Sequence, residues 1–386
     1  MKKQLIRIAS WMLLATMGQA GAFAQNIRID MNQTYPEKTI NLQKVADVKY
    51  IPLETTDEML FNGIVTNLSA EGIAGFNKKE GDILVFDGTG KAIASFNHTG
   101  QGPNEYNKIY HLDVDWKQKE VYVQDNFRQK IRIYGLDGRH LRTIDLQETM
   151  QEGDLYNFSD THLIYYAQPK SKPVTAYEPV TLLSKKDASK VTLPFTKTDD
   201  NLVKATGGPF GDMKMSAKNV NLLCKKGDEV YVNEVTADVI YRVESNHALT
   251  PVVERTPSYQ DASGQDFFLM LTGANARYYF FKRQQALLEF QGNAATDTKS
   301  TYVAYDRKEK QLLNPTFTNE DYPSQDIPMS KLLQCAGSAN RCYLQLEAFK
   351  LKEALAEGKL KGTLKSIAEK LDEEDNPVLM VVEFKK

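Results

Sequence analysis

The chain has 386 residues, with 48 Lys and Arg against 50 Asp and Glu, which gives a formal net charge of −2. A nearly neutral chain lacks the broad basic excess that attracts nucleic acids or anionic membranes, so both classes of partner are excluded on charge. Its 19 Tyr and 17 Phe against 2 Trp favour β-strands with aromatic packing. The length exceeds one ordinary domain but fits a single large all-β fold.

The first 24 residues have the order of features expected of a signal peptide. Lys2, Lys3 and Arg7 give a positive start, an apolar run follows from Trp11, and Ala22-Phe23-Ala24 matches a cleavage site. The apolar run is too short to span a bilayer of about 30 Å. We therefore expect cleavage after Ala24 and a periplasmic or secreted chain of residues 25–386. No cysteine lies near that site, which argues against a lipoprotein.

Beyond the leader, a hairpin unit recurs along the chain. "EGDILVFDGTGKAIASF" (80–96) and "QKIRIYGLDGRHLRTIDL" (129–146) each contain a strand, a tight Asp-Gly turn and a second strand. Looser copies occupy 179–195, 238–254 and 300–317, and a further apolar strand lies upstream of each copy. Four antiparallel strands in roughly 40–60 residues are typical of a propeller blade. A β-sandwich also has many short strands, but it does not require this repeated unit.

A sixth blade has to come from the two ends of the chain. "RCYLQLEAF" (341–349) and "NPVLMVVEF" (376–384) read as strands, and residues 350–374 between them have amphipathic helical spacing. Near the N-terminus, "VADVKYIPLET" (45–55) is an unpaired strand. Pairing it with the C-terminal strand would close the ring and remove both open edges. The predicted fold is an all-β, six-bladed β-propeller of four-stranded antiparallel blades with one helical insertion near the C-terminus.

These segments also carry a family resemblance. "YIPLETT", "ILVFDGTGK", "GQGPNEY", "IYGLDGR" and the C-terminal "NPVLMVVEF" together resemble the six-bladed β-propeller family of exported Bacteroides-type proteins, which is related to NHL-repeat propellers. The resemblance covers essentially all of the chain after the leader and is weakest in the middle. It implies a fold and an exported location more than an activity.

The stretch "HTGQGPNEY" (98–106) invites comparison with a phosphate-binding glycine loop. A third glycine and a following helix are missing, because Gly100 and Gly102 are followed by Glu105 and then by a strand. The stretch is therefore interpreted as the crossover from the outer strand of blade 1 to the inner strand of blade 2, with "TGGPFGD" (206–212) as its counterpart two blades on.

Strand parity places "GQGPNEY", "TGGPFGD", "DNFRQK" (125–130) and the helical insertion on one face of the ring, where loops commonly bind ligands. Tyr106 offers an aromatic ring that can stack on a sugar or a peptide, and Asn104, Glu105 and Arg128 offer polar groups that can fix its orientation. The bland alternative, in which Glu105 and Arg128 are solvated or paired with each other, is favoured over ligand contact. The candidate ligand-binding residues are Asn104, Glu105, Tyr106, Asp125, Asn126 and Arg128.

No nucleophile elbow, zinc-protease motif or Cys/His zinc spacing occurs. His111, Asp113 and Asp115 alternate along one inner strand and so share a face, which makes them weak candidates for a channel metal such as calcium. Their satisfaction by neighbouring groups is the favoured interpretation, and no cofactor is expected. Cys335 and Cys342 could form a disulfide in an oxidising compartment or stay free in neighbouring strands, and Cys224 is interpreted as a core residue.

The sequence thus favours an exported binding or interaction module for a glycan, a peptide or a surface protein, with no catalytic residue assigned. The alternative is a metal-dependent hydrolase or lyase with its site at the central channel. Three or more convergent His, Asp, Glu or Asn side chains at the channel would distinguish the second class from the first.

Overall fold

The structure is a computed structural model that describes residues 27–385 with gaps. The predicted signal peptide lies outside the described residues. So do Asn126, Arg128, Cys335 and all of "TGGPFGD" after Thr206. The undescribed residues are 1–26, 126–128, 147–148, 169–177, 197–201, 207–212, 217–221, 260, 262–266, 292–293, 296–298, 333, 335 and 386.

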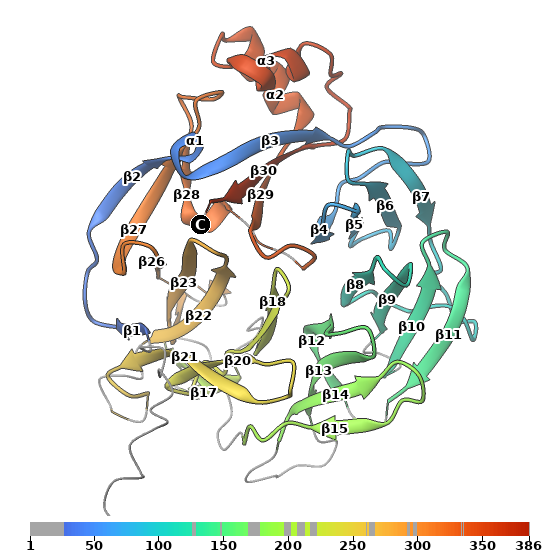
Figure 1. Cartoon of the computed structure of the whole chain (residues 1–386), viewed down its shortest axis with the longest axis vertical. Helices are drawn as coiled ribbons and strands as arrows, with labels where there is room; N and C mark the ends of the chain where they lie inside the picture. Colours follow the sequence, from blue (N-terminus) through green and yellow to red (C-terminus); the bar gives the residue numbers. More distant parts are fainter. Residues whose placement is uncertain are drawn as a thin grey trace, which may run out of the picture.

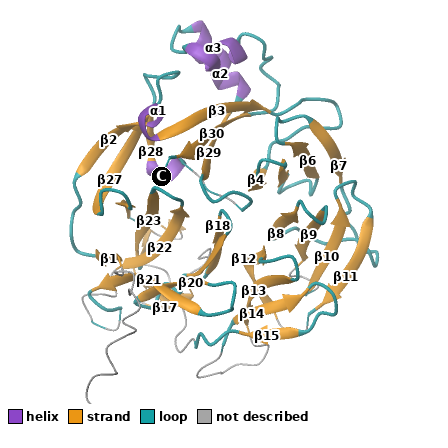
Figure 2. Ribbon diagram, in the orientation of Figure 1, coloured by secondary structure: helices purple, strands orange, loops and turns teal. Residues whose placement is uncertain are grey.

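Six antiparallel blades form a ring around a central axis, which confirms the predicted fold class (Figures 1 and 2). Blades 1 to 3 follow one another along the chain, each with its first strand innermost. Blade 1 contains β4 (Ile64–Leu68), β5 (Gly72–Phe76), β6 (Ile83–Asp87) and β7 (Ala92–Phe96); blade 2 contains β8 (His111–Asp115), β9 (Glu120–Asp125), β10 (Lys130–Gly135) and β11 (His140–Asp145); blade 3 contains β12 (Thr149–Asn157), β13 (His162–Gln168), β14 (Val180–Ser184) and β15 (Lys190–Thr192).

Blades 4 and 5 repeat this plan, and blade 6 combines both ends of the chain. Blade 4 contains β18 (Leu223–Lys226), β19 (Glu229–Val232), β20 (Val239–Val243) and β21 (Leu249–Thr256); blade 5 contains β22 (Phe267–Ala274), β23 (Tyr278–Gln285), β26 (Ser300–Asp306) and β27 (Gln311–Thr318); blade 6 contains β29 (Arg341–Leu346), β30 (Val378–Phe384) and β3 (Ala46–Pro52). The predicted closure of the ring is confirmed, because β3 pairs antiparallel with β30 along its whole length, from Ala46 opposite Phe384 to Pro52 opposite Val378.

The segment before β3 runs around the rim, a feature that the sequence did not predict. β1 (Ile27–Asp30) pairs parallel with β21 on the outer edge of blade 4, and β2 (Glu37–Asn41) pairs parallel with β27 on the outer edge of blade 5. A single turn of helix, α1 (Leu42–Val45), then leads into β3. We call residues 27–52 the rim segment. It covers the outer edges of blades 4 and 5 and supplies the outer strand of blade 6 (Figure 1).

Each blade buries both faces against its neighbours, so the inner and middle strands are apolar at successive positions rather than alternating. Between blades 1 and 2, Phe76 and Val85 pack with Leu112 and Val123. The Asp-Gly turns between the outer strands have the predicted geometry: Gly90 and Gly138 take positive φ of 91° and 81°. The Asp87 carboxylate in the first of these turns accepts hydrogen bonds from the backbone N–H groups of Thr89 and Lys91.

Two additions complete the described fold. The predicted helical insertion is confirmed as two short helices, α2 (Ala348–Ala356) and α3 (Gly362–Ala368), which project beyond the ring between β29 and β30 (Figure 1). A small extra sheet contains β16 (Leu202–Thr206), β17 (Met213–Ser216), β24 (Leu287–Gln291) and β25 (Ala294–Ala295). No helix in the described part of the chain is long and apolar enough to cross a membrane.

Candidate functional site

The "HTGQGPNEY" loop is a compact, internally bonded crossover, as the sequence predicted. The backbone N–H of Tyr106 donates to the His98 carbonyl and that of Gly100 donates to the Tyr106 carbonyl, so the two ends of the loop pair with each other. Inside the loop, the Glu105 carboxylate accepts a 2.6 Å hydrogen bond from the Gly102 N–H. A Cβ on Gly100 would lie 2.1 Å from that carboxylate, so a larger residue at this position would displace the Glu105 side chain.

Tyr106 does not present an aromatic ring to solvent. The side chain is fully buried between blades 1 and 2, where its hydroxyl donates to the Gly81 carbonyl at 2.8 Å and accepts from the His98 N–H at 3.0 Å. Burial raises the pKa of the Tyr106 hydroxyl to about 12. The exposed stacking platform expected from the sequence is therefore corrected to a buried side chain that fixes the loop.

The loop and the "DNFRQK" segment meet, as strand parity predicted. Asp125, the first residue of that segment, accepts a hydrogen bond from the Asn107 N–H at 3.0 Å and pairs with Arg132 at 2.8 Å. Both charged side chains are fully buried, so Asp125 anchors the loop to β10. Of the candidate contacts that can be described, Asn104 is exposed and Glu105 is half-buried.

The three polar residues of β8 do not converge on one point at the centre of the ring. The His111 ring contacts the Tyr156 ring edge-on at 4.8 Å, Asp113 binds the N–H of Asn157, and Asp115 binds Lys185. All three partners belong to blade 3, which agrees with the prediction that the three residues share a face. Within the described residues, no group of three or more His, Cys, Asp or Glu side chains comes together as a metal site.

Asp113 joins four blades. Its Oδ1 accepts a 2.7 Å hydrogen bond from the Asn67 side chain of β4, and its Oδ2 accepts a 2.8 Å bond from the Asn157 N–H at the end of β12. Lys225 of β18 lies 3.4 Å from Oδ2 and donates to the Asn157 carbonyl at 2.8 Å. The Asp113 side chain is fully buried and Lys225 nearly so. This charged cluster connects the inner strands of blades 1 to 4.

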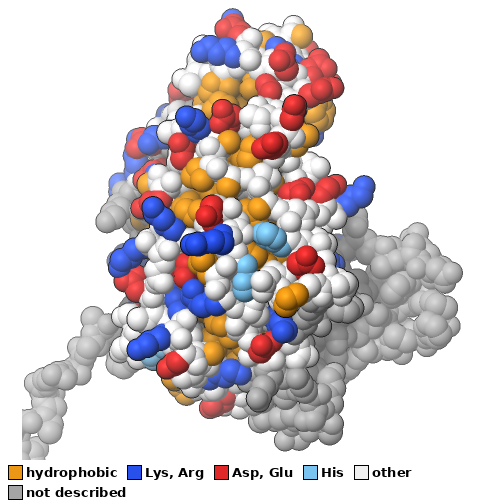
Figure 3. Space-filling model, turned by 90° about the vertical axis from the view of Figure 1, so that its right-hand side faces the viewer, with side chains coloured by type: hydrophobic (Ala, Val, Ile, Leu, Met, Phe, Trp, Pro, Cys, Tyr) orange, Lys and Arg blue, Asp and Glu red, His pale blue; other side chains and the backbone are white. Residues whose placement is uncertain are grey.

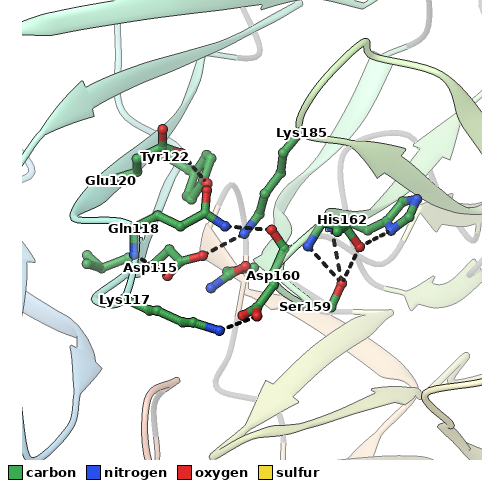
Figure 4. Close-up of polar contacts among 12 residues, drawn as sticks. Asp115, Lys117, Gln118, Glu120, Tyr122, Ser159, Asp160, His162 and Lys185 are labelled. Atoms are coloured by element: carbon green, nitrogen blue, oxygen red, sulfur yellow. Dashed lines mark hydrogen bonds and ion pairs between the residues drawn. The ribbon is translucent and has the colours of Figure 1, made fainter.

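A second polar cluster fills the seam between blades 2 and 3 (Figure 4). Lys185, in the turn after β14, pairs with Asp115 at 2.7 Å, and both side chains are only 5% exposed. The Lys185 ammonium also lies 5.3 Å from the centre of the Tyr122 ring. At the surface of the same seam, Lys117 pairs with Asp160, whose carbonyl accepts from the Gln118 side chain.

The ion pair with Lys185 changes the proton affinity of Asp115. Burial alone would raise the pKa of this carboxyl, but hydrogen bonds from Lys185 and from the backbone of Gln118, with the lysine charge, outweigh burial and lower it. Asp115 therefore stays ionised and holds blade 2 to blade 3.

Among the described residues, the inner strands also hold buried polar atoms with no hydrogen bond of normal geometry. They include Nε2 of His111 and both carboxylate oxygens of Asp154, on β12. Burial lowers the pKa of His111 to about 4, which keeps its ring neutral at physiological pH. Burial raises the pKa of Asp154 well above its ordinary value, and the backbone N–H groups of Leu222 and Leu223 oppose this only in part.

One segment crosses the centre of the ring. Ala336 forms bridges to Asn67 on blade 1 and to Gly227 on blade 4, and its carbonyl accepts from the Leu68 N–H at 2.8 Å. Gln334 and Asn340 hold the same segment to blade 5 through the backbone of Ala274 and Ala276. This stretch before β29 lies among the inner strands (Figure 1), so the centre of the ring is partly filled by the chain itself.

The geometry defines a six-bladed β-propeller whose inner wall is cross-linked by buried ion pairs. The chain belongs to the family described as "Domain of unknown function (DUF4934)", which matches residues 26–383. No curated protein matches it.

Two solved Bacteroides structures share the fold. A Bacteroides fragilis protein described as exported is 15% identical, with a TM-score of 0.61 over 93% of this chain and 99% of that one. A Bacteroides vulgatus member of the DUF4221 family is 9% identical, with a TM-score of 0.51 over 89% and 98% of the respective chains.

Sequence reasoning missed the two buried lysines, Lys225 on the inner strand of blade 4 and Lys185 in the seam between blades 2 and 3. Lys185 stands in "SKKDASK" and Lys225 in "LLCKKGDE", and each precedes a second, adjacent lysine. Lysine pairs in turns are normally solvated, so neither stretch suggested a buried charge. The signal that could have found Lys225 is its position directly after the apolar run Leu222-Leu223-Cys224, which continues the inner strand of blade 4.

Proposed function

We propose that this protein is an exported binding module whose ligand is a glycan, a peptide or a surface protein, and that it acts outside the inner membrane after removal of residues 1–24. The observation that carries the proposal is that both carboxylates of β8 form ion pairs with lysines. Asp113 and Asp115 were the residues best placed for channel chemistry, and each is instead paired with a lysine from another blade. Carboxylates held in this way serve to join blades, which leaves loops and rim as the surfaces for recognition.

The exported location draws on two supports. The N-terminal sequence has the charge, apolar run and small-residue site of a signal peptide. The Bacteroides fragilis protein that shares the fold is described as exported. A ring joined by buried ion pairs and closed by its own ends suits a stable scaffold that displays loops.

The experiment is a binding screen on the purified chain that begins at Gln25, using a glycan array and a displayed peptide library. The expected result is saturable binding to a member of one class, with binding retained by Asp113→Asn protein that circular dichroism shows to be folded. Asn104→Ala, which changes an exposed residue of the crossover loop, tests the face predicted from the sequence. Stoichiometric calcium or zinc, together with ester or lactone turnover that Asp113→Asn abolishes, would instead establish the hydrolase alternative.

A further inference from the structure

The rim segment shows how an outer blade edge accepts an extended chain. Along β1, Ile27 and Ile29 are buried in the core between blades 4 and 5, while Arg28 points outward and pairs with Glu254 of β21 at 3.2 Å. The backbone lies in parallel register with β21, from Ile27 opposite Val253 to Asp30 opposite Thr256. Recognition therefore combines a backbone ladder, apolar anchors at alternate positions and a charge pair on the outer side.

Within the described part of the chain, the outer edges of blades 1, 2 and 3 have no such cover, because no strand pairs with the outer side of β7, β11 or β15. Proteins commonly protect such edges with charge or a covering segment. β11 carries two charged residues, Arg142 and Asp145, and a bulge at Leu141. Each of the three edge strands nevertheless exposes one large apolar side chain: Ile93 at 48%, Leu141 at 38% and Val191 at 45%.

Each of these edges also begins at an exposed basic residue, namely Lys91, Arg139 and Lys190. Blade 1 shows what a carboxylate does at this position. Just after the rim segment, the Glu54 carboxylate accepts a 2.8 Å hydrogen bond from the N–H of Ala92, the first residue of β7. An acidic group thus caps the start of the blade 1 edge within the chain itself.

Among the three edges, β11 is the best suited to a partner. β15 is only 3 residues long, and the start of β7 is already capped, whereas β11 has 6 residues. The Leu146 N–H donates to the carbonyl of Gln129, the residue before β10, so the backbone groups of Leu146 face β10. Along an antiparallel strand, the backbone groups of successive residues face the partner strand and away from it in turn. Arg142 and Ile144 therefore also face β10, whereas Thr143 and Asp145 direct their backbone N–H and C=O groups to the open side. Figure 3 shows this side of the ring, where apolar side chains form a band between charged ones.

We propose that the outer edge of β11 binds an extended peptide segment of an exported partner as an added parallel strand, with an acidic residue near its N-terminal end and apolar residues at alternate positions. Parallel addition follows the direction of β1 and β2 on blades 4 and 5. It places the start of the peptide beside Arg139, and it places one apolar side chain of the peptide beside Leu141. The inference rests on the proposed function, because it names a partner for a binding module.

The probe is a fluorescent eight-residue peptide that starts with Asp and alternates Ile with Thr, measured by fluorescence anisotropy against the chain from Gln25. Two comparison peptides test the mode of binding. One starts with Lys instead of Asp, and the other carries N-methyl groups on alternate amides, which removes the backbone ladder. The Asp peptide is expected to bind, the Lys peptide about tenfold more weakly, and the methylated peptide not at all.

Leu141→Lys and Arg139→Glu should each weaken binding of the Asp peptide about tenfold. Val191→Lys is the matched control, since it makes the same change on the edge of blade 3, and it should leave binding unchanged. All three residues are exposed, so the fold tolerates each change.

Equal binding of the Asp peptide to the Leu141→Lys variant, or no binding to the parent, would overturn the inference. A concentration-dependent dimer that Leu141→Lys abolishes would also overturn it, because the occupant would then be a second copy of this chain. If a screened glycan or peptide binds parent and Leu141→Lys equally, the binding module stands and only the β11 site fails. If no ligand of any class binds, both proposals fail.

Discussion

Replacing Lys185 with methionine tests whether the buried ion pairs hold the ring together. The change keeps most of the apolar stem but leaves Asp115, 5% exposed, without its cation. Removal of one partner of a buried pair costs about 3–5 kcal/mol, because the remaining charge stays buried. We expect the lower value, about 3 kcal/mol at pH 7, because Asp115 keeps the 3.0 Å hydrogen bond from the Gln118 N–H.

The loss of stability in Lys185→Met should also depend on pH. In the parent, the pKa of Asp115 is lowered, so the stability from this group is present above the unfolded pKa of about 3.9 and is lost as the pH falls below it. In the variant, burial acts without the lysine and raises the pKa of Asp115 above its unfolded value. The stability difference between the two proteins should therefore shrink as the pH falls from 7 towards 4.

Urea unfolding followed by circular dichroism measures both effects. Lys186→Met is the matched control, because Lys186 is the next residue and is exposed, and it should change the free energy of unfolding by no more than about 0.5 kcal/mol. The double variant Asp115→Asn/Lys185→Met removes both charges and should regain part of the loss. If Lys185→Met is as stable as Lys186→Met at pH 7, or if its deficit does not change with pH, the structural role given to the pair is wrong.

Three further outcomes are expected. Deleting residues 27–55 should give an aggregating chain, because β30 loses its partner strand, whereas deleting β1 and β2 alone should lower the melting temperature and leave a monomer, as sedimentation would show. Tyr106→Phe should cost about 1–2 kcal/mol in urea unfolding, because loss of the hydroxyl removes its hydrogen bonds to the half-buried Gly81 carbonyl and His98 N–H. A Cys335→Ser protein keeps two cysteines, Cys224 and Cys342, whose thiol pKa values are raised by burial to about 11 and about 12. Ellman's reagent at pH 8 should react with neither of them until the chain unfolds.

The ring and its closure were predictable because they follow from local patterns. Asp-Gly turns mark the outer hairpins of blades 1 and 2, the other blades repeat the same two-strand unit more loosely, and the strands alternate or are fully apolar, as blades require. The strand at 45–55 needed a partner, and "NPVLMVVEF" offered one. Both inferences use short segments whose chemistry does not depend on distant residues.

The rim segment and the buried lysines were not predictable in the same way. β1 alternates apolar and charged residues over only 4 positions, and the first three residues of β2 are exposed, so neither segment is long or regular enough to predict a strand by itself. Each becomes a strand only because a blade edge far along the chain offers a ladder. The local sequence around Lys185 likewise predicts a surface residue, and only the packing of blade 3 against blade 2 brings it beside Asp115. Tyr106 lies in a polar loop, and only the packing of two blades decides that its ring is buried.

The rim segment also sets an order on folding. β3 pairs with residues near the opposite end of the chain, and β1 pairs with Val253–Thr256, so neither contact can form until nearly all intervening residues are available. Such non-local pairing is slow, since loop closure costs entropy before any contact repays it. A chain that crosses a membrane from its N-terminus would thus have to keep its first strands unpaired until its last strand arrives. Blades 1 to 3 are built from neighbouring hairpins and can form meanwhile. The N-terminal strands then pair with blades 4, 5 and 6 in the last step and close the ring.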